Sequence, residues 1–297
     1  MFEVIIIGGS YAGLSAALAL GRARRRVLVL DAGRPRNRFT PHAHNLLLHD
    51  GDAPADLAAR ARQQVAAYPT VQLLTTEATG AARLPSGVFE VTTSQGSFTA
   101  GRLLLATGMH DELPPVPGFA ECWGKSVIHC PFCHGYEVAD LPTGIWNNGD
   151  EVAHQVRLLL NWTRELTVFT NGPATFGDDV RQLLRTHAIP LEETPVAALL
   201  HTGGQLTALR LADGRELPLP VLYARLPAQQ ASTLPQQLGC ALTSQGLIQI
   251  DENYLTTVPG VWAAGDCCTF IAQLALAIAA GNKVGGTLCR ELIFGSL

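Results

Sequence analysis

Short apolar runs alternate with longer segments of helical composition along this chain, and turns rich in glycine or polar residues separate them. The first run, Val4–Ile7, passes through Gly8 and Gly9 into an apolar segment at 14–20 and then, after Arg26, into a second run at 27–30. Runs of this length favour buried strands, and the segment between them favours a helix. The order strand, helix, strand is typical of α/β folds with a parallel sheet.

The same order returns after a proline-rich link at residues 113–118. A second strand, turn, helix and strand is predicted around residues 144–170, and a long apolar helix is predicted from about residue 272. We therefore predict an α/β protein with two Rossmann-like nucleotide-binding-type domains. The first would be discontinuous and comprise residues 1–112 and 243–297, and the central domain would comprise residues 113–242.

The first turn has features of a dinucleotide site. It reads Gly8-Gly9-Ser10-Tyr11-Ala12-Gly13 and leads into the predicted helix, whose unpaired amides and dipole attract a pyrophosphate. Gly8 permits the tight turn, and Gly13 lets the helix pack close to the strand. The small Ser10 stands where a second glycine is usual. Asp31 ends the next strand about 20 residues later, where a carboxylate accepts ribose hydroxyls. A glycine-rich turn of any α/β domain is the alternative, and Asp31 weighs against it.

Composition narrows the function classes. The net charge of −4 gives no signal for nucleic-acid binding. No uncharged apolar stretch reaches the length of a membrane helix, and the apolar N-terminal run lacks a basic leader, so we expect a cytoplasmic protein away from membranes. Seven cysteines in a reducing compartment are not expected to form a disulfide framework, so a close pair there is more often redox-active or metal-binding.

The pair Cys130 and Cys133, in Cys130-Pro131-Phe132-Cys133-His134, is the most informative stretch. Cysteines at i and i+3 can close a short disulfide. Pro131 suits the first position of a helix, which would place Cys130 at the N-cap. Amides there stabilise a thiolate. The imidazole of His134, with an ordinary pKa of ~6.5, can move protons near neutral pH.

Three other interpretations of this stretch remain open. The C-x-x-C-H spacing also occurs at c-type haem attachment sites, which require export. A zinc site using Cys122 with the pair and His134 is possible, although the chain has no second C-x-x-C. The pair can also be two inert buried cysteines.

Residues 3–31, the strand end Ala106-Thr107-Gly108 and Gly265-Asp266 together resemble the two-dinucleotide-binding-domain flavoproteins. The proline link followed by the cysteine pair resembles the low-molecular-weight thioredoxin reductases. This resemblance implies FAD in the first domain and a homodimer. It implies cofactor contacts by Gly8, Ser10, Gly13, Asp31, Asn45, Thr107, Gly108, Asp266 and Gln273.

The resemblance also implies individual roles. Asn45 would lie near the isoalloxazine, Asp266 at the ribitol and pyrophosphate, and Gln273 at the pyrimidine edge. Cys133 would face the flavin and Cys130 would attack a partner's disulfide. His134 stands where the family has an aspartate that donates or accepts protons.

The second glycine turn departs from the family pattern of glycines at 147 and 149 and a small residue at 152. This chain has Asn147, Gly149 and Val152, and the next strand ends at Thr170 without an Arg for NADPH or an acidic residue for NADH. We therefore predict that NAD(P)H is not the electron donor. Another flat ligand, such as a second flavin, could occupy this crevice.

The sequence thus predicts an FAD-dependent thiol–disulfide oxidoreductase that uses Cys130 and Cys133. The substrate would be a thioredoxin-like protein or a small-molecule dithiol or disulfide, with ferredoxin or flavodoxin as possible donors. The alternatives are a dithiol oxidase that reduces oxygen, an NADPH-dependent thioredoxin reductase, and a flavin redox sensor without turnover.

Overall fold

The computed structural model describes residues 1–295, and the chain divides into two compact units. The first unit comprises residues 1–38, 46–110 and those from 228 onward, and the second comprises 39–45 and 111–227. Within residues 1–295, no helix combines the length and apolar character needed to cross a bilayer.

The sheet of the first unit has the strand order β3-β2-β1-β6-β5-β4, and β17 also pairs with β6. Strands β1, β2, β3, β6 and β17 are parallel, whereas β4, β5 and β6 pair in antiparallel fashion. The strands are β1 (Phe2–Ile7), β2 (Val27–Asp31), β3 (Val71–Thr75), β4 (Ala78–Arg83), β5 (Phe89–Thr93), β6 (Gly96–Leu105) and β17 (Val261–Ala263).

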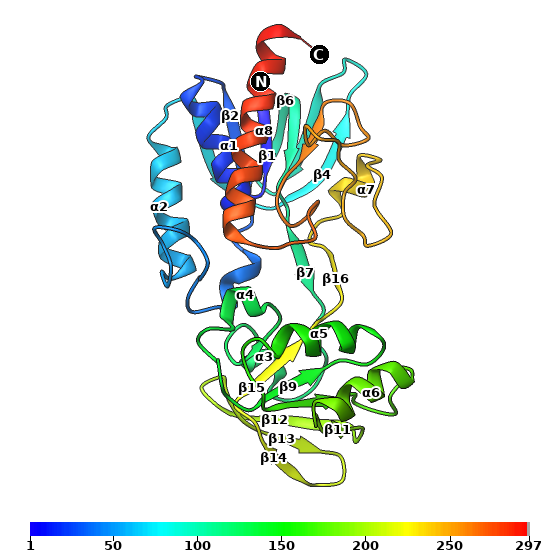
Figure 1. Cartoon of the computed structure of the whole chain (residues 1–297). Coiled ribbons are helices and arrows are strands. Elements are labelled where there is room, and N and C mark those ends of the chain that lie inside the picture. The colour runs from blue at the N-terminus through cyan, green and yellow to red at the C-terminus, as the bar shows by residue number, and fades with distance from the viewer. Residues whose placement is uncertain (296–297) are drawn as a thin grey trace. The chain divides into compact units, whose positions relative to one another are not determined.

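Both faces of this sheet are buried, which explains the uninterrupted apolar run of β1. Val4 and Ile6 pack on the side of helices α1 (Tyr11–Arg22) and α8 (Leu274–Phe294), while Ile5 and Ile7 pack into the core of the opposite face. Figure 1 shows α8 running beside α1, with α2 (Pro54–Ala66) nearby. The helices α1 and α8 can approach closely because Gly281 has no side chain. A Cβ atom at this position would overlap the backbone of Ala12.

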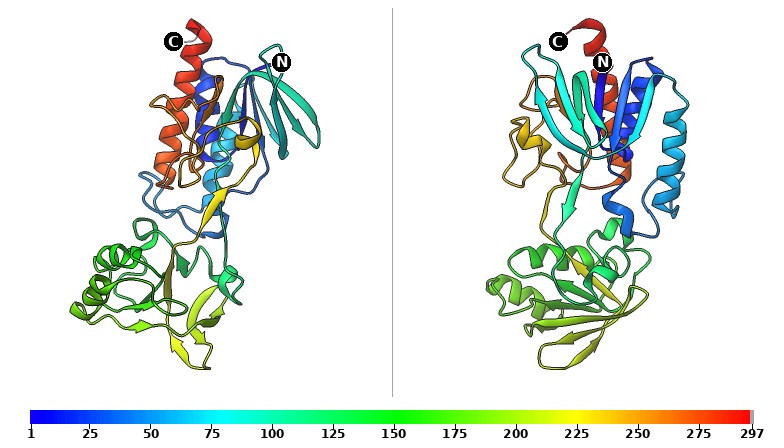
Figure 2. Two further views of the ribbon diagram at one scale, coloured as in Figure 1. Left: turned by 90° about the vertical axis from the view of Figure 1, so that its right-hand side faces the viewer. Right: turned by 180° about the vertical axis from the view of Figure 1, so that it is seen from behind.

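The second unit contains a parallel sheet with the order β11-β10-β9-β15-β8. Helices α5 (Glu151–Leu159) and α6 (Asp178–Thr186) cover one face, and an antiparallel sheet covers the other (Figure 2). The strands are β8 (Val127–Ile128), β9 (Thr143–Trp146), β10 (Leu166–Phe169), β11 (Leu191–Glu192), β12 (Val196–Thr202), β13 (Gln205–Leu211), β14 (Glu216–Pro218) and β15 (Val221–Ala224). The predicted α/β class with two Rossmann-like units is confirmed.

The remaining elements are short. They are η1 (Arg36–Phe39), β7 (Met109–Asp111), α3 (Phe119–Cys122), α4 (Pro131–His134), β16 (Ala228–Gln230) and α7 (Leu234–Gln237).

The boundaries of the units differ from the predicted ones at residues 39–45, 111–112 and 228–242. Residues 228–242 group with the first unit because β16 pairs with β7 and the Gln237 side chain accepts a hydrogen bond from the Ala81 amide of β4 at 3.2 Å. Residues 39–45 group with the second unit, where Phe39 packs against Gly124. Neither grouping has a local signal in the sequence, since each depends on contacts between distant segments.

Candidate active site

The turn between β1 and α1 has the shape that a pyrophosphate site requires. Gly8 has a φ of 111°, and a Cβ atom there would overlap the carbonyl oxygen of Ala106. A Cβ atom on Gly13 would overlap the carbonyl oxygen of Gly8. Ser10 is the N-cap of α1, but its side chain makes no capping hydrogen bond. The helix therefore begins with amide donors that no side chain at the cap satisfies.

Two carboxylates predicted as cofactor contacts lie in this first unit, each held by an arginine. Asp31, at the end of β2, accepts a hydrogen bond from the Gly9 amide at 3.2 Å and pairs with Arg62. Asp266, after β17, pairs with Arg36 at 3.1 Å. Neither arginine was predicted, because nothing in the spacing of the chain relates Arg36 or Arg62 to its acidic partner.

The strand end Thr107-Gly108 supplies an unpaired polar atom. The Thr107 hydroxyl is buried without a hydrogen-bond partner in the protein, and Gly108 has a φ of 70°. Gln273 is the N-cap of α8, and its side chain also makes no capping bond. An uncapped helix start, a turn without side chains and an orphaned hydroxyl together fit a dinucleotide cofactor.

Asn45 is placed differently from the other predicted cofactor residues. It lies in the segment 39–45, which groups with the second unit, and it adopts a left-handed φ of 60°. The other eight residues predicted to contact the cofactor lie in the first unit.

Cys130 and Cys133 form a disulfide with their Cα atoms 5.3 Å apart. As predicted, Pro131 starts α4 and Cys130 is its N-cap. The amides of Cys133 and His134 both donate to the Cys130 carbonyl, each at 3.2 Å. Among the described residues no group of three or more His, Cys, Asp or Glu gathers as metal ligands do, and Cys122 is a separate buried thiol.

His134 lies four residues after Cys130, the spacing that places two side chains on one side of a helical turn. Both of its ring nitrogens are buried and have no hydrogen-bond partner in the protein. Burial lowers the pKa of His134, and nearby His44 lowers it further, whereas the Glu137 carboxylate acts to raise it.

Three further groups near His134 were not predicted. His44 Nδ1 lies 3.4 Å from Glu137 Oε1, and the buried Tyr223 hydroxyl has no hydrogen-bond partner in the protein. Burial, followed by the charge of Glu137, raises the pKa of Tyr223. The i, i+3 spacing could have identified Glu137 from sequence, but His44 and Tyr223 come from distant segments.

Aromatic rings flank the disulfide. Phe132 is 58% exposed and packs edge-on against Trp162, with their ring centroids 5.6 Å apart. Tyr136 is 86% exposed. His129, just before Cys130, stacks on Trp123. The disulfide therefore lies beside apolar surface that a substrate can contact.

The second glycine turn, residues 147–150 between β9 and α5, is closed by its own side chains. The Asn148 carboxamide oxygen accepts from the amides of Gly149 at 3.0 Å and Thr175 at 2.7 Å. Its nitrogen donates to the carbonyl of Pro173 at 2.9 Å. The Asn147 carboxamide oxygen accepts a hydrogen bond from the Asn148 amide at 2.7 Å. Two amides of the turn, those of Asn148 and Gly149, are thus already paired with side chains.

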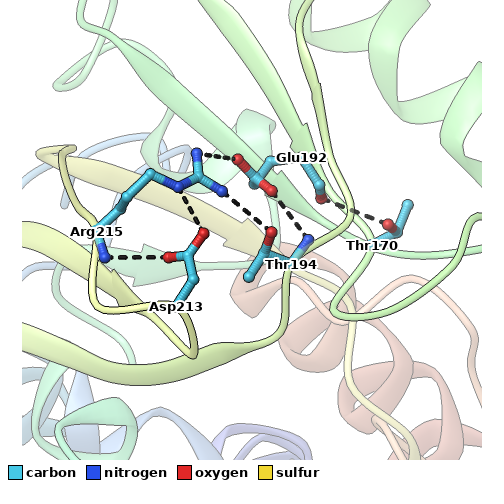
Figure 3. Close-up of polar contacts among 5 residues, drawn as sticks. All are labelled: Thr170, Glu192, Thr194, Asp213 and Arg215. Carbon is cyan, nitrogen blue, oxygen red and sulfur yellow. Dashed lines mark hydrogen bonds and ion pairs between the residues drawn. The ribbon is translucent and has the colours of Figure 1, made fainter.

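The end of β10 is held by a polar network (Figure 3). The Thr170 amide donates to the Glu192 carbonyl at 3.1 Å. Arg215 pairs with Glu192 at 2.8 Å and with Asp213 at 2.6 Å, and it also donates to the Thr194 hydroxyl at 3.1 Å. These bonds lower the pKa of Glu192 to about 2, mainly through Arg215 and then Thr194. Arg215 is therefore committed to carboxylates and not directed toward a phosphate.

Comparison with known proteins agrees with this architecture. Residues 2–281 match the family model described as pyridine nucleotide-disulphide oxidoreductase. The protein named thioredoxin reductase aclD from Aspergillus oryzae is 33% identical over 99% of this chain and 97% of its own.

Two solved structures are similar over nearly the whole chain. A putative thioredoxin reductase, TrxB, from Bacillus anthracis superposes with a TM-score of 0.94 at 30% identity, covering 99% of both chains. An oxidoreductase from Agrobacterium tumefaciens superposes with a TM-score of 0.91 at 38% identity, also covering 99% of both chains. This chain thus belongs to the pyridine nucleotide-disulphide oxidoreductase family, as a thioredoxin reductase-like, FAD-dependent oxidoreductase.

Proposed function

We propose that this protein exchanges electrons between FAD and a disulfide or dithiol substrate through Cys130 and Cys133, without taking them from NADH or NADPH. The observation that carries the proposal is the Cys130–Cys133 disulfide, which lies at the start of α4 with His134 beside it. The substrate would be a thioredoxin-like protein, in keeping with the names of the relatives, or a small-molecule dithiol or disulfide.

The cysteines can carry out the exchange in two balanced steps. The Cys130 thiolate attacks the substrate disulfide, which forms a mixed disulfide and releases one substrate thiolate. The Cys133 thiolate then attacks the Cys130 sulfur, which restores the Cys130–Cys133 bond and releases the second substrate thiolate. The substrate gains two electrons and two protons, and the pair loses the same. A dithiol substrate runs the steps in reverse, and His134 takes or supplies a proton at sulfur.

FAD, when bound, supplies the two-electron chemistry that reduces or reoxidises the cysteine pair. The residues that would hold it are Gly8, Ser10, Gly13, Asp31, Asn45, Thr107, Gly108, Asp266 and Gln273. The amides at the start of α1 would bind the pyrophosphate, since Ser10 leaves them uncapped. The buried Thr107 hydroxyl would gain a partner from the cofactor.

The second turn supports a donor other than NAD(P)H. The Asn148 side chain accepts hydrogen bonds from the amides of Gly149 and Thr175, so a pyrophosphate would have to displace this side chain. A 2′-phosphate near Thr170 would meet the carboxylate of Glu193, which accepts the Ala174 amide at 2.7 Å, while Arg215 is already paired with Glu192 and Asp213. We propose ferredoxin or flavodoxin as the class of donor. A second flavin in this crevice stays a prediction.

The proposal includes a homodimer in a reducing, cytoplasmic setting. Its support is the resemblance to the thioredoxin reductases, together with the five free cysteines of the structure. Sedimentation velocity at micromolar concentration tests the dimer, since a single 31.6 kDa species would contradict it.

Anaerobic mixing tests the donor and the disulfide separately. Purified flavin-loaded protein is mixed with excess NADPH, NADH, dithionite or dithiothreitol while the flavin absorbance is followed. We expect no bleaching by either nicotinamide, and bleaching by dithionite and dithiothreitol. Cys133→Ser should lose the response to dithiothreitol and keep the response to dithionite.

The outcomes separate the two parts of the proposal. Bleaching by NADPH at a catalytic rate would overturn nicotinamide independence and favour an ordinary NADPH-dependent thioredoxin reductase. A Cys133→Ser protein that responds to dithiothreitol like the wild type would overturn the role of the pair. Rapid reoxidation by oxygen after dithiol reduction would favour the dithiol oxidase.

A further inference from the structure

Three buried polar atoms near the disulfide have no hydrogen-bond partner in the protein. They are both ring nitrogens of His134 and the hydroxyl of Tyr223. Buried polar atoms are nearly always paired and unpaired ones are costly to keep, so each requires an explanation, of which a catalytic or redox role is one. One imidazole with two unpaired nitrogens can accept a proton on one side and release it on the other.

Glu137 is the acidic group common to this cluster. It follows His134 by three residues, and its charge acts on both His134 and Tyr223. Its carboxylate also lies 3.4 Å from His44 Nδ1. The Glu137 side chain is 38% exposed, whereas His44 Nδ1 and both His134 nitrogens are buried, so Glu137 is the member of the cluster that reaches solvent.

The groups around His134 come from three elements. The segment 39–45 contributes His44, and the ring centroids of His44 and His42 are 6.4 Å apart. Helix α4 and the turn after it contribute the two cysteines and Glu137. Strand β15 contributes Tyr223, whose backbone pairs with Ile128 of β8 just before the cysteine segment.

We propose that Glu137 and His44 are positioning residues that form the outer half of a proton relay, and that His134 is its inner half. When the Cys130–Cys133 bond is reduced by a dithiol, His134 gives a proton to a cysteine sulfur and regains one from solvent through Glu137 and His44. When the pair is oxidised, the proton leaves by the same route. The relay rests on the proposed function, since it serves the two protons of that exchange.

The arrangement predicts shifts of opposite sign. The Glu137 carboxylate stabilises the protonated His134 imidazole, so Glu137→Gln lowers the titration midpoint of His134. His44 destabilises the protonated imidazole, so His44→Gln raises that midpoint. If the two substitutions only disturbed the local structure, the His134 titration midpoint would not shift in opposite directions.

The test is an NMR titration of the oxidised, flavin-loaded protein with histidine-selective labelling. The His134 signal is assigned by its absence in His134→Asn. The matched controls are Glu216→Gln, which removes an exposed carboxylate paired with Arg210, and His187→Gln, an exposed histidine after α6. We expect a lower midpoint in Glu137→Gln, a higher one in His44→Gln and no change in the controls.

A kinetic readout accompanies the titration. Dithiothreitol-driven flavin reduction should slow about tenfold in Glu137→Gln, and added imidazole buffer should restore part of the rate by carrying the proton itself. Unchanged midpoints, or shifts of the same sign in both variants, overturn the relay. The titration needs neither substrate nor electron flow, so its result stands even if the proposed thiol–disulfide exchange fails its own test.

Discussion

Arg36 and Asp266 form an ion pair with a nitrogen–oxygen distance of 3.1 Å, although they lie 230 positions apart in the sequence. The pair joins the region after β2 to the loop that precedes α8. Each side chain is about a quarter exposed. Both ends of the chain therefore contribute to one candidate cofactor site in the first unit.

Replacing Asp266 should weaken FAD binding if this carboxylate contacts the cofactor. Asp266→Ala removes the carboxylate and its charged hydrogen bond to Arg36. We expect a loss of affinity between about tenfold and a hundredfold, from a contribution of about 1.5–3 kcal/mol. Flavin content and a fluorescence titration of the apoprotein measure it. Wild-type affinity in Asp266→Ala would remove this residue from the cofactor site.

Gly8→Ala should abolish the first nucleotide turn. The new Cβ atom would overlap the Ala106 carbonyl oxygen, and the φ of 111° is one that alanine rarely adopts. We expect little folded, flavin-containing protein.

The matched control is Gly87→Ala, which has a φ of 84° and no atom within 4 Å of the new Cβ. It should lose only about 1–2 kcal/mol of unfolding free energy through backbone strain. Circular dichroism during urea unfolding compares the two variants, and equal losses would show that the overlap with Ala106 is easily relieved.

Asn148 should stabilise the second turn. Asn148→Ala removes the side-chain hydrogen bonds to Gly149, Thr175 and Pro173, and net values of about 0.5–1.5 kcal/mol per bond apply to such contacts. We expect a loss of about 2 kcal/mol in the unfolding free energy. Urea unfolding measures it, with Asn161→Ala, an exposed asparagine, as the control. No loss in Asn148→Ala would mean that water replaces these bonds at no cost.

Glu192 should make the stability of the protein depend on pH in acid. Arg215 and Thr194 hold its pKa at about 2, against an ordinary value of 4.5. Because the folded-state pKa is lowered, this contribution is complete above pH 4.5 and is lost as the pH falls toward 2.

The measurement is the free energy of unfolding of the wild type and of Glu192→Gln between pH 6 and 2. The difference between the two proteins should shrink as the pH falls. Arg215 is half exposed, so added salt should reduce the difference at every pH. A difference that stays constant with pH would show that the carboxylate charge contributes nothing.

Local features of the chain could be predicted because short-range geometry determines them. Only glycine fits the turn at Gly8, apolar runs of strand length mark buried parallel strands, and Pro131 marks the start of a helix with Cys130 at its cap. These rules predicted the two α/β units, the glycine turn at the start of α1 and the disulfide.

The tertiary structure decided which distant residues meet. It paired Asp31 with Arg62 and Asp266 with Arg36, brought His44 to Glu137 beside the disulfide, and closed the second turn with Asn148. It also assigned residues 39–45 and 228–242 to units other than those predicted. The sequence by itself determined the elements and the closeness of the two cysteines, because backbone sterics and residue spacing act over a few positions. Which residue pairs with each charged group depends on packing between segments far apart in the chain, and no local sequence pattern encodes that packing.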